Sequence, residues 1–419
     1  MLLHILLEGI FLMKQRIVFV DLHCNMFLVR TLSHILFKHS VALKHDFLLK
    51  HFLDDERIDV CNFVSRKDTS VLKEANFFGG IWKKIWPHLS WLENWIILHH
   101  NHLPIKTINS TDDVQPNDIV IGYIHYTDAL SAMKDLCGLK IVSLLHIYGE
   151  MAESRLLQEV APDILFSEAY LNKYSKLFRK NYSWYKGQYI LMPFKYQPRF
   201  CVKKNFSARK KRAVAMGTIT ERNTPEFVEA YGSSCYQPMR KQILDHANEL
   251  SDIIDCCISP FHEVDMKIPD NAGVFKKICK KIENLYASQQ KKYFSFDMVE
   301  KYNDYKMVIC PEDVQGMPGI GFVEAMACGC AYIGLDYCGY SDLGLIEGKH
   351  FIGYDGSLSD LRQKIEYYMQ EEHQEELSEI AANGTAYVRA HFSEEAVAER
   401  FVEKLLEVAN GRLRDASGK

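Results

Sequence analysis

The chain has 419 residues, of which 47% are hydrophobic and 25% are charged, and its formal net charge at pH 7 is −4. This composition is that of a folded globular protein rather than a disordered one, and the length predicts two domains. The slightly acidic balance argues against a general nucleic-acid binder, whose binding surface would be basic.

The amino-terminal segment MLLHILLEGIFLMKQR contains an apolar run that Glu8 interrupts. It is shorter than the roughly 20 apolar residues that span a bilayer, and it lacks the small-residue cleavage site of a signal peptide. We expect residues 1–13 to form a short leading helix or an extension ahead of a start at Met13, with a membrane-surface helix as a third interpretation. The twelve scattered cysteines include no C-x-x-C pair and no zinc-finger spacing, which indicates reduced thiols and a cytosolic location.

Five apolar runs in the first half of the chain predict buried strands, at residues 16–22, 118–126, 139–150, 163–169 and 188–194. Segments with helical spacing, such as YTDALSAMKDLCG and EAYLNKYSKLFRKN, lie between these runs. Because strands and helices alternate, we expect a parallel sheet that is covered on both faces.

A tryptophan-rich segment, FFGGIWKKIWPHLSWLENWIILHH, lies within the same half and holds four of the five tryptophans. Lys83 and Lys84 stand between Trp82 and Trp86. Tryptophan mixed with lysine is typical of membrane interfaces and of surfaces that stack on sugars. Two interpretations stay open, a hydrophobic helix packed on the first domain and a face that contacts an acceptor or a membrane.

A basic, apolar-poor stretch at 203–213 predicts a linker, and a second series of strands follows it, at 212–218, 253–259, 305–312, 331–336 and 350–355. We therefore expect an N-terminal domain over 14–205 and a C-terminal domain over 206–390. The segment 391–411 predicts a helix with Ser393 as its N-cap, two glutamates in its first turn and its end at Gly411. Residues 412–419 would form a tail.

The stretch CPEDVQGMPGIGFVEAMACGCAYIGL, at 310–335, combines a strand end, a Gly/Pro-rich loop, a short helix and the next strand. Ligands of open parallel sheets bind outside the carboxyl ends of the strands. Glycines such as Gly316 and Gly319 would let the backbone approach a ligand, and the first N–H groups of the helix at 320–328 would face an anion or a sugar hydroxyl. Glu324 would accept hydrogen bonds from a vicinal diol such as a ribose. An ordinary tight turn is the alternative.

The segments GFVEAMACGCAYIGLDYCGYSDLGLIEGKHFIGYD and HFSEEAVAERFVEKLLE resemble the C-terminal half of GT-B glycosyltransferases, in particular the retaining family 4 group. The resemblance is strong over about 300–405 and extends over 14–260 mainly through the order of the strands. It implies an α/β fold of two Rossmann-like domains whose parallel sheets face a central cleft. It also implies that the C-terminal helix crosses back to the first domain, which would bind the acceptor.

This resemblance assigns donor-binding roles to residues of the C-terminal domain. Glu324 matches the second glutamate of the family's Glu-x7-Glu motif and would bind the donor ribose. The first glutamate of that motif falls on a glycine here, so Gln315 and Glu312 are the two alternatives for its role. The amides of the intervening turn would hold the donor sugar, and its residues are Gly316, Met317, Pro318 and Gly319.

The segment AMGTITER resembles the part of the family that follows the first strand of the C-terminal domain, where a basic side chain binds the donor diphosphate. Arg222 is the candidate for this catalytic role, with Gly217 and Thr218 lining the approach. A solvated surface arginine is the alternative, in which case Lys210 and Lys211 compete for the role.

The segment IVSLLHIYGE resembles the first-domain strand that ends in a histidine near the reaction centre, and His146 is the matching residue, with a buried core histidine as the alternative. The resemblance implies a retaining, metal-independent hexosyltransferase with no cofactor other than its co-substrate, a nucleotide-diphosphate sugar of the UDP or GDP type. The sequence has no Asp-x-Asp triplet, which is the metal-binding device of the other large transferase fold.

The acceptor implied by this resemblance is a surface polysaccharide of the cell envelope, including a lipid-linked one. The enzyme would act in the cytoplasm, with peripheral contact at the inner face of the cell membrane and without a nucleic-acid partner. Two other functions stay open for the same fold. One is a non-catalytic protein that binds a sugar nucleotide or scaffolds a glycan assembly complex, and the other is an epimerase.

Overall fold

The computed structural model describes residues 14–22, 45–64, 96, 98–99, 103–124, 127–260 and 296–417. The leading segment 1–13 and the residues Trp82, Lys83, Lys84 and Trp86 lie outside the described residues, so their predicted roles stay predictions. Within the described ranges, no helix combines the length and the apolar character needed to cross a membrane.

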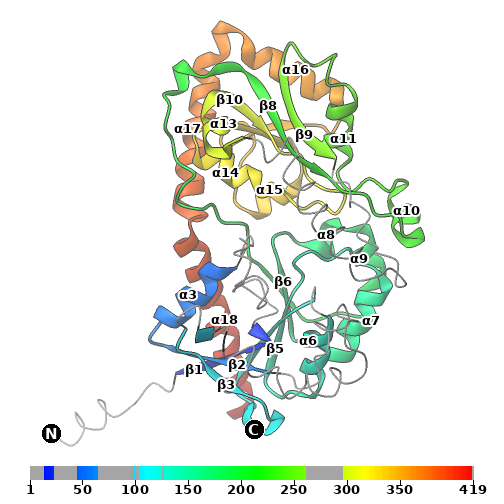
Figure 1. Cartoon of the computed structure of the whole chain (residues 1–419), viewed down its shortest axis with the longest axis vertical. Helices are drawn as coiled ribbons and strands as arrows, with labels where there is room; N and C mark the ends of the chain where they lie inside the picture. Colours follow the sequence, from blue (N-terminus) through cyan, green and yellow to red (C-terminus); the bar gives the residue numbers. More distant parts are fainter. Residues whose placement is uncertain are drawn as a thin grey trace, which may run out of the picture. The chain divides into compact units, whose positions relative to one another are not determined.

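The chain divides into two compact units, drawn in Figure 1. The first unit contains the described residues within Met1–Ser167, together with Ser183–Leu191 and Ala398–Lys419. The second unit contains Glu168–Tyr182 and Met192–Val397. The segment Glu168–Tyr182 therefore belongs to the second unit, although the strands on either side of it belong to the first.

The first unit is built on a seven-stranded parallel sheet with the order β3-β2-β1-β4-β5-β6-β7. The central strands are apolar along most of their length, because helices cover both faces of a parallel sheet. Its strands are β1 (Gln15–Val20), β2 (Ile58–Phe63), β3 (Lys106–Ile108), β4 (Ile119–Tyr123), β5 (Leu139–Ser143), β6 (Ile164–Ser167) and β7 (Gln188–Leu191). Its other elements are α3 (Asp46–Asp54), η2 (Thr111–Asp113), α6 (Thr127–Ala132), η3 (Met133–Asp135) and α7 (Met151–Val160).

The second unit is built on a five-stranded parallel sheet with the order β12-β11-β10-β8-β9. Its strands are β8 (Lys210–Ile219), β9 (Ile254–Pro260), β10 (Tyr305–Ile309), β11 (Ala331–Leu335) and β12 (Ile352–Tyr354). Its helices are α8 (Leu171–Tyr174), α9 (Lys176–Asn181), η4 (Phe206–Ala208), α10 (Pro225–Tyr231), α11 (Pro238–Asp245), α13 (Met298–Asp304), α14 (Gly321–Ala327), α15 (Cys338–Asp342), α16 (Leu358–Met369), η6 (Glu371–His373) and α17 (Gln374–His391).

The core of the second unit lies between this sheet and the helices that pack on it. Helix α11 packs on β8 and β9, α16 packs on β8 and β12, and α14 and α17 pack on β11 and on each other. Met239 and Ile243 of α11 meet Leu361 and Ile365 of α16 in one buried apolar cluster. Burial of apolar side chains such as these favours folding by about 25 cal/mol per Å² of apolar surface removed from water.

The C-terminal helix α18 (Glu394–Ser417) begins in the second unit and belongs to the first unit from Ala398 onward. The hydroxyl of Ser393 accepts a hydrogen bond from the Ala396 N–H at 3.1 Å, so the predicted N-cap is present. The Phe401 ring lies 4.9 Å from the Phe166 ring of β6, centroid to centroid. The predicted return of this helix to the first domain agrees with these contacts.

Some predicted boundaries were wrong. Helix α18 does not end at Gly411, which lies inside the helix and is not among the glycines with positive φ. The linker at 203–213 is partly strand, because β8 already begins at Lys210. Strands β2 and β3 were not predicted. Two polar residues break the apolar run of β2, the exposed Asp59 and the buried Asn62, whose side chain accepts a hydrogen bond from the Leu22 N–H at 2.9 Å.

Candidate functional site

The five-stranded sheet of the second unit has a topological switch point between β8 and β10. From β8 the chain crosses to β9 at one edge, and it then returns to β10 on the other side of β8. Ligands of open parallel sheets bind outside the carboxyl ends of the strands at such a point. The end of β8 and the loop 310–320, which follows β10, therefore form the candidate site.

The loop after β10 is folded around the side chain of Asp313. Its carboxylate accepts hydrogen bonds from the N–H groups of Gln315 at 2.8 Å and Met317 at 3.1 Å, and its carbonyl accepts one from the Gly316 N–H at 3.0 Å. Gly316 has φ +73°, and a Cβ at that position would lie 2.7 Å from the Cβ of Tyr174. Desolvation raises the pKa of Asp313 to about 7, although the hydrogen bonds from the loop lower it.

Glu312 and Gln315, the two residues predicted to replace the missing glutamate, both form hydrogen bonds with other residues of the second unit. The Glu312 carboxylate accepts hydrogen bonds from the Leu335 N–H at 3.0 Å and from the Tyr340 hydroxyl. The Gln315 side chain is fully buried, and its amide donates to the Tyr236 hydroxyl at 2.5 Å. Desolvation also raises the pKa of Glu312. These contacts hold the loop against β11 and against the segment that precedes α11.

Glu324 lies in the first turn of α14 and is 9% exposed. Desolvation raises the pKa of its carboxyl to about 7, while the cations of Arg199 and Lys195 and a hydrogen bond from Tyr302 lower it. Lys195 is itself buried and forms an ion pair with Glu394, at the start of α18. The carboxylate therefore sits in a poorly hydrated environment, where a hydrogen-bond donor from a ligand would be worth more than in water.

One arginine that contacts the predicted site, Arg240, was not predicted from the sequence. Arg240, in the first turn of α11, donates from Nε to the Pro311 carbonyl at 3.0 Å and from Nη1 to the Thr218 carbonyl at 3.0 Å. A Cβ at Gly217 would lie 3.0 Å from the guanidinium carbon, and one at Gly319 would lie 2.9 Å from Nη2. Three of the predicted residues thus meet around Arg240, at the ends of β8 and β10.

Arg222, the predicted diphosphate ligand, lies three residues beyond the end of β8 and is half-buried. Its N–H donates to the Ser234 carbonyl at 2.7 Å, which ties the start of this connection to the segment before α11. The two competing lysines, Lys210 and Lys211, lie at the amino end of β8, at the edge of the sheet opposite the switch point. Their position argues against the diphosphate role.

Met317 and Pro318 complete the predicted turn, and Pro318 is buried whereas Met317 is half-buried. Cys310, which directly follows β10, interacts electrostatically with both Arg240 and Glu324. Its thiol has a pKa that desolvation raises to about 12, and both the Arg240 cation and the Glu324 carboxylate act on it electrostatically. The Arg240 and Glu324 side chains therefore both act on one buried thiol.

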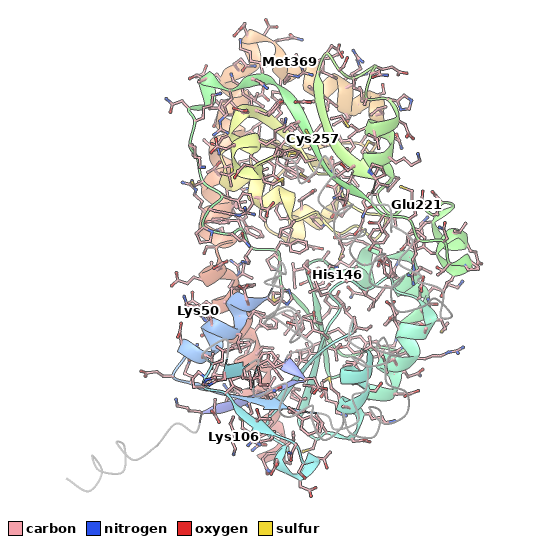
Figure 2. All side chains as sticks on the ribbon, viewed as in Figure 1. Lys50, Lys106, His146, Glu221, Cys257 and Met369 are labelled. Atoms are coloured by element: carbon pink, nitrogen blue, oxygen red, sulfur yellow. The ribbon has the colours of Figure 1, made fainter. Side chains whose placement is uncertain are left out.

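His146 belongs to the first unit, where it follows the carboxyl end of β5 by three residues (Figure 2). It is exposed and has φ +63°, a left-handed conformation that few residues other than glycine adopt. The alternative of a buried core histidine is therefore wrong. A strained, exposed histidine beyond the end of a central strand is compatible with a functional role.

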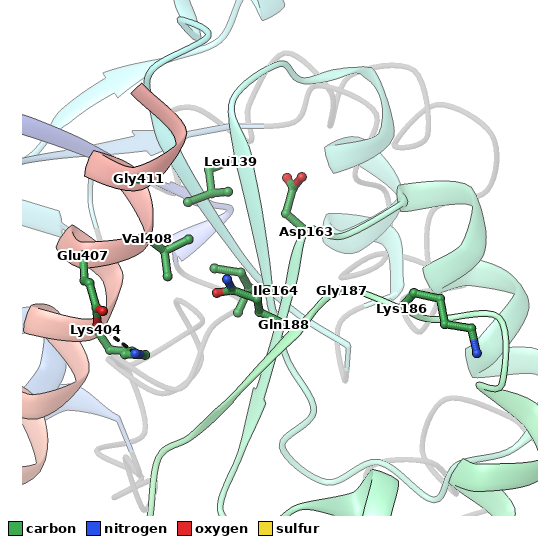
Figure 3. Close-up of a pocket in the computed structure, with 10 residues that line it drawn as sticks. All are labelled: Leu139, Asp163, Ile164, Lys186, Gly187, Gln188, Lys404, Glu407, Val408 and Gly411. Atoms are coloured by element: carbon green, nitrogen blue, oxygen red, sulfur yellow. Dashed lines mark hydrogen bonds and ion pairs between the residues drawn. The ribbon is translucent and has the colours of Figure 1, made fainter. Parts of the chain in front are cut away.

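A separate cavity of about 440 Å³ lies in the first unit, between α18 and the first residues of three strands (Figure 3). Leu139, Ile164 and Gln188 begin β5, β6 and β7, so the cavity is at the amino edge of this sheet. On the helix side it is lined by Lys404 and Glu407, whose side chains pair at 2.7 Å. Ligands of such sheets bind at the opposite edge, so this cavity is not the candidate site.

Comparison with solved structures defines the class to which this fold belongs. The chain is similar to HepE from Anabaena, solved in complex with UDP-glucose, with a TM-score of 0.50 and 13% identity over 94% of this chain and 100% of that one. It is also similar to sucrose-phosphate synthase from Thermosynechococcus elongatus, with a TM-score of 0.50 and 12% identity over 95% and 100% of the two chains. At such low identity the likeness concerns the fold alone. The predicted GT-B fold is confirmed.

Within that fold class, residues 277–403 match the model of a family described as glycosyl transferase-like. The matched segment contains the loop after β10, helix α14 and Glu324. It overlaps the residues on which the sequence resemblance depends, so that resemblance to GT-B glycosyltransferases is also confirmed. No curated protein sequence matches the chain significantly.

Proposed function

We propose that this protein is a glycosyltransferase that moves a hexose from a nucleotide-diphosphate sugar to a glycan acceptor, with retention of configuration and without a metal ion. In this proposal the acceptor is a surface polysaccharide or its lipid-linked precursor. The protein acts in the cytoplasm at the inner face of the cell membrane, and the segment with Trp82 and Trp86 faces the acceptor or the lipid.

The observation that carries the proposal is the meeting of Gly217, Thr218 and Gly319 around one arginine at the β8/β10 switch point. The glycines at 217 and 319 allow the backbone to approach a ligand, and the arginine provides positive charge. This arrangement lies partly within the segment that matches the glycosyl transferase-like family. The positive charge of Arg240 suits the phosphates of a nucleoside diphosphate.

Transfer of a sugar places negative charge on the leaving diphosphate as the anomeric C–O bond breaks. A fixed cation and backbone N–H groups that face this charge lower the barrier, because they need little reorganisation during the reaction. In the proposed site Glu324 accepts hydrogen bonds from the donor ribose, and the turn from Gly316 to Gly319 holds the donor sugar. His146 acts from the first unit, near the acceptor.

The direct test is calorimetric titration of the full chain with UDP, GDP and ADP, followed by incubation of the corresponding sugar nucleotides with glycan acceptors. UDP is the first choice, because the similar HepE structure was solved with UDP-glucose. We expect one nucleoside diphosphate to bind, and we expect its release from the sugar nucleotide to require an acceptor. Absence of binding by every nucleoside diphosphate would contradict the proposal.

A second candidate function, a non-catalytic sugar-nucleotide binder, is favoured by one specific observation. Position 316, which matches the first glutamate of the family motif, is a glycine, and both neighbouring candidates bind inward, Glu312 to Tyr340 and Gln315 to Tyr236. The same incubation separates the two functions. A binder would take up the sugar nucleotide but release no nucleoside diphosphate with any acceptor.

A further inference from the structure

The guanidinium of Arg240 uses two of its five N–H donors in hydrogen bonds within the second unit. Nε donates to the Pro311 carbonyl and Nη1 donates to the Thr218 carbonyl, both at 3.0 Å. An arginine has five N–H donors in a rigid fork, so both N–H groups of Nη2 and one of Nη1 have no acceptor among the described residues. Such a fork is suited to bidentate binding of phosphate oxygens.

Two glycines lie against the same guanidinium. Gly217 has φ +137°, and a side chain there would meet the guanidinium carbon, Nε and Cδ of Arg240 at 3.0–3.1 Å. A side chain at Gly319 would meet Nη2, the nitrogen without an acceptor, at 2.9 Å. A side chain at either position would displace the arginine or cover the N–H groups of Nη2, which have no acceptor among the described residues.

Helix α11 fixes the arginine in this position. Its neighbours Met239 and Ile243 are buried in the core between the helix and the sheet, so the backbone from which Arg240 extends is anchored. The Coulombic effect of the Arg240 cation lowers the pKa of both Glu312 and Asp313, although desolvation outweighs it and raises both. Since burial disfavours ionisation of these carboxyl groups, they offset the positive charge of the arginine only in part.

We infer that Arg240 is the residue that binds the diphosphate of the donor, in place of the predicted Arg222. The inference rests on the proposed function, because it assigns one residue within that site. The cation then reaches the diphosphate from α11, between the ends of β8 and β10, and not from the connection that follows β8. Bidentate hydrogen bonds from one N–H of Nη2 and the remaining N–H of Nη1 to the phosphate oxygens would engage four of the five donors of the guanidinium.

The competing explanation is a structural role, in which Arg240 only links the ends of β8 and β10 through its hydrogen bonds. A pair of ligands distinguishes this role from phosphate binding. UDP carries the diphosphate, and uridine carries only the base and ribose. If Arg240 binds phosphate, Arg240→Gln weakens UDP at least tenfold and changes uridine affinity less than about twofold, because only UDP loses hydrogen bonds between charged groups. Arg240→Lys keeps the charge but not the fork, so it recovers part of the loss.

Lys241→Gln, at the next residue, whose side chain pairs with Asp245 on the surface, is the control and should bind UDP as the wild type does. Arg222→Gln tests the competing assignment, and the inference predicts no UDP-specific loss in this variant. Titration calorimetry measures UDP, ligand-observed NMR measures uridine, and the melting temperature checks folding of each variant. If the donor panel favours GDP, the pair becomes GDP and guanosine.

Three results would overturn the inference. These are an equal loss for both ligands in Arg240→Gln, no loss for either, or a UDP-specific loss in Arg222→Gln instead. Each of them leaves the proposed function standing, because the wild type still binds the nucleotide. Absence of nucleotide binding by the wild type would instead remove the proposed function and, with it, this inference.

Discussion

Replacement of Glu324 by glutamine should stabilise the protein, and more so at high pH. The Glu324 carboxyl is 9% exposed, and desolvation raises its pKa from 4.5 to about 7. Between these two values the folded state holds a proton that the unfolded state has lost. The contribution of Glu324 to the free energy of unfolding therefore falls as pH rises through this range, and it is lowest above about pH 7. Glutamine resembles the protonated carboxyl in shape and carries no charge to bury.

The size of the change in unfolding free energy follows from the difference between the folded and unfolded pKa values of Glu324. A difference of about 2.5 pKa units corresponds to about 3 kcal/mol of unfolding free energy at pH 8.5, at 1.36 kcal/mol per unit. At pH 5.5 only about 1 kcal/mol of this difference is expressed, because the folded state is still protonated. Glu324→Gln should thus gain about 2 kcal/mol relative to the wild type between pH 5.5 and pH 8.5.

Urea unfolding of both proteins at pH 5.5 and pH 8.5 measures this difference directly. Glu399→Gln makes the same chemical change at an exposed position of α18 and is the control. The reasoning is refuted if Glu324→Gln destabilises the protein at pH 8.5, or if its effect is the same at both pH values. Either result would mean that the carboxylate is well stabilised when ionised.

Three further predictions concern binding. UDP affinity should rise as pH increases through about 7 in the wild type but not in Glu324→Gln, because only the ionised carboxylate accepts hydrogen bonds from both ribose hydroxyls. Calorimetric titrations of both proteins over the same pH range measure this difference, because the titration of UDP itself affects both equally. Identical pH dependence in the two proteins would disprove the prediction. Gly319→Ala should weaken UDP several-fold with little change in melting temperature, since its methyl group would meet Nη2 of Arg240 at 2.9 Å and otherwise only the Cys310 carbonyl at an ordinary contact distance of 3.5 Å. Gly411→Ala, where a methyl group meets nothing within 4 Å, should bind as the wild type does. Flotation with liposomes should decrease in the double variant Trp82→Ala, Trp86→Ala, and unchanged flotation would end the membrane interpretation.

The sequence was most informative where apolar runs are continuous. All five strands of the second sheet were predicted, because runs such as MVI and AYIGL are buried on both faces and contain no charge. Strand β2 was missed because Asp59 and Asn62 interrupt its run. Asn62 is polar for a tertiary reason, the hydrogen bond from Leu22, which no local pattern contains.

Some residues of the candidate site can likewise be predicted from the sequence, and others can be found only from the fold. Its glycines and Glu324 stand next to strand ends that can be predicted, so the sequence alone indicates them. Arg240 is 21 residues beyond the end of β8, and nothing in PMRKQILD distinguishes it from a surface arginine until the sheet order is known. The inward contacts of Glu312 and Gln315 likewise depend on Tyr340 and Tyr236, which only the fold brings to them.

The central claim is that the second unit binds a nucleoside diphosphate at the β8/β10 switch point, and a crystal structure of the chain with bound UDP tests it most directly. The account predicts the diphosphate against Nη1 and Nη2 of Arg240 and the ribose hydroxyls within hydrogen-bond distance of the Glu324 carboxylate. A nucleotide found elsewhere, such as in the cavity beside α18, with these two side chains untouched, would contradict it.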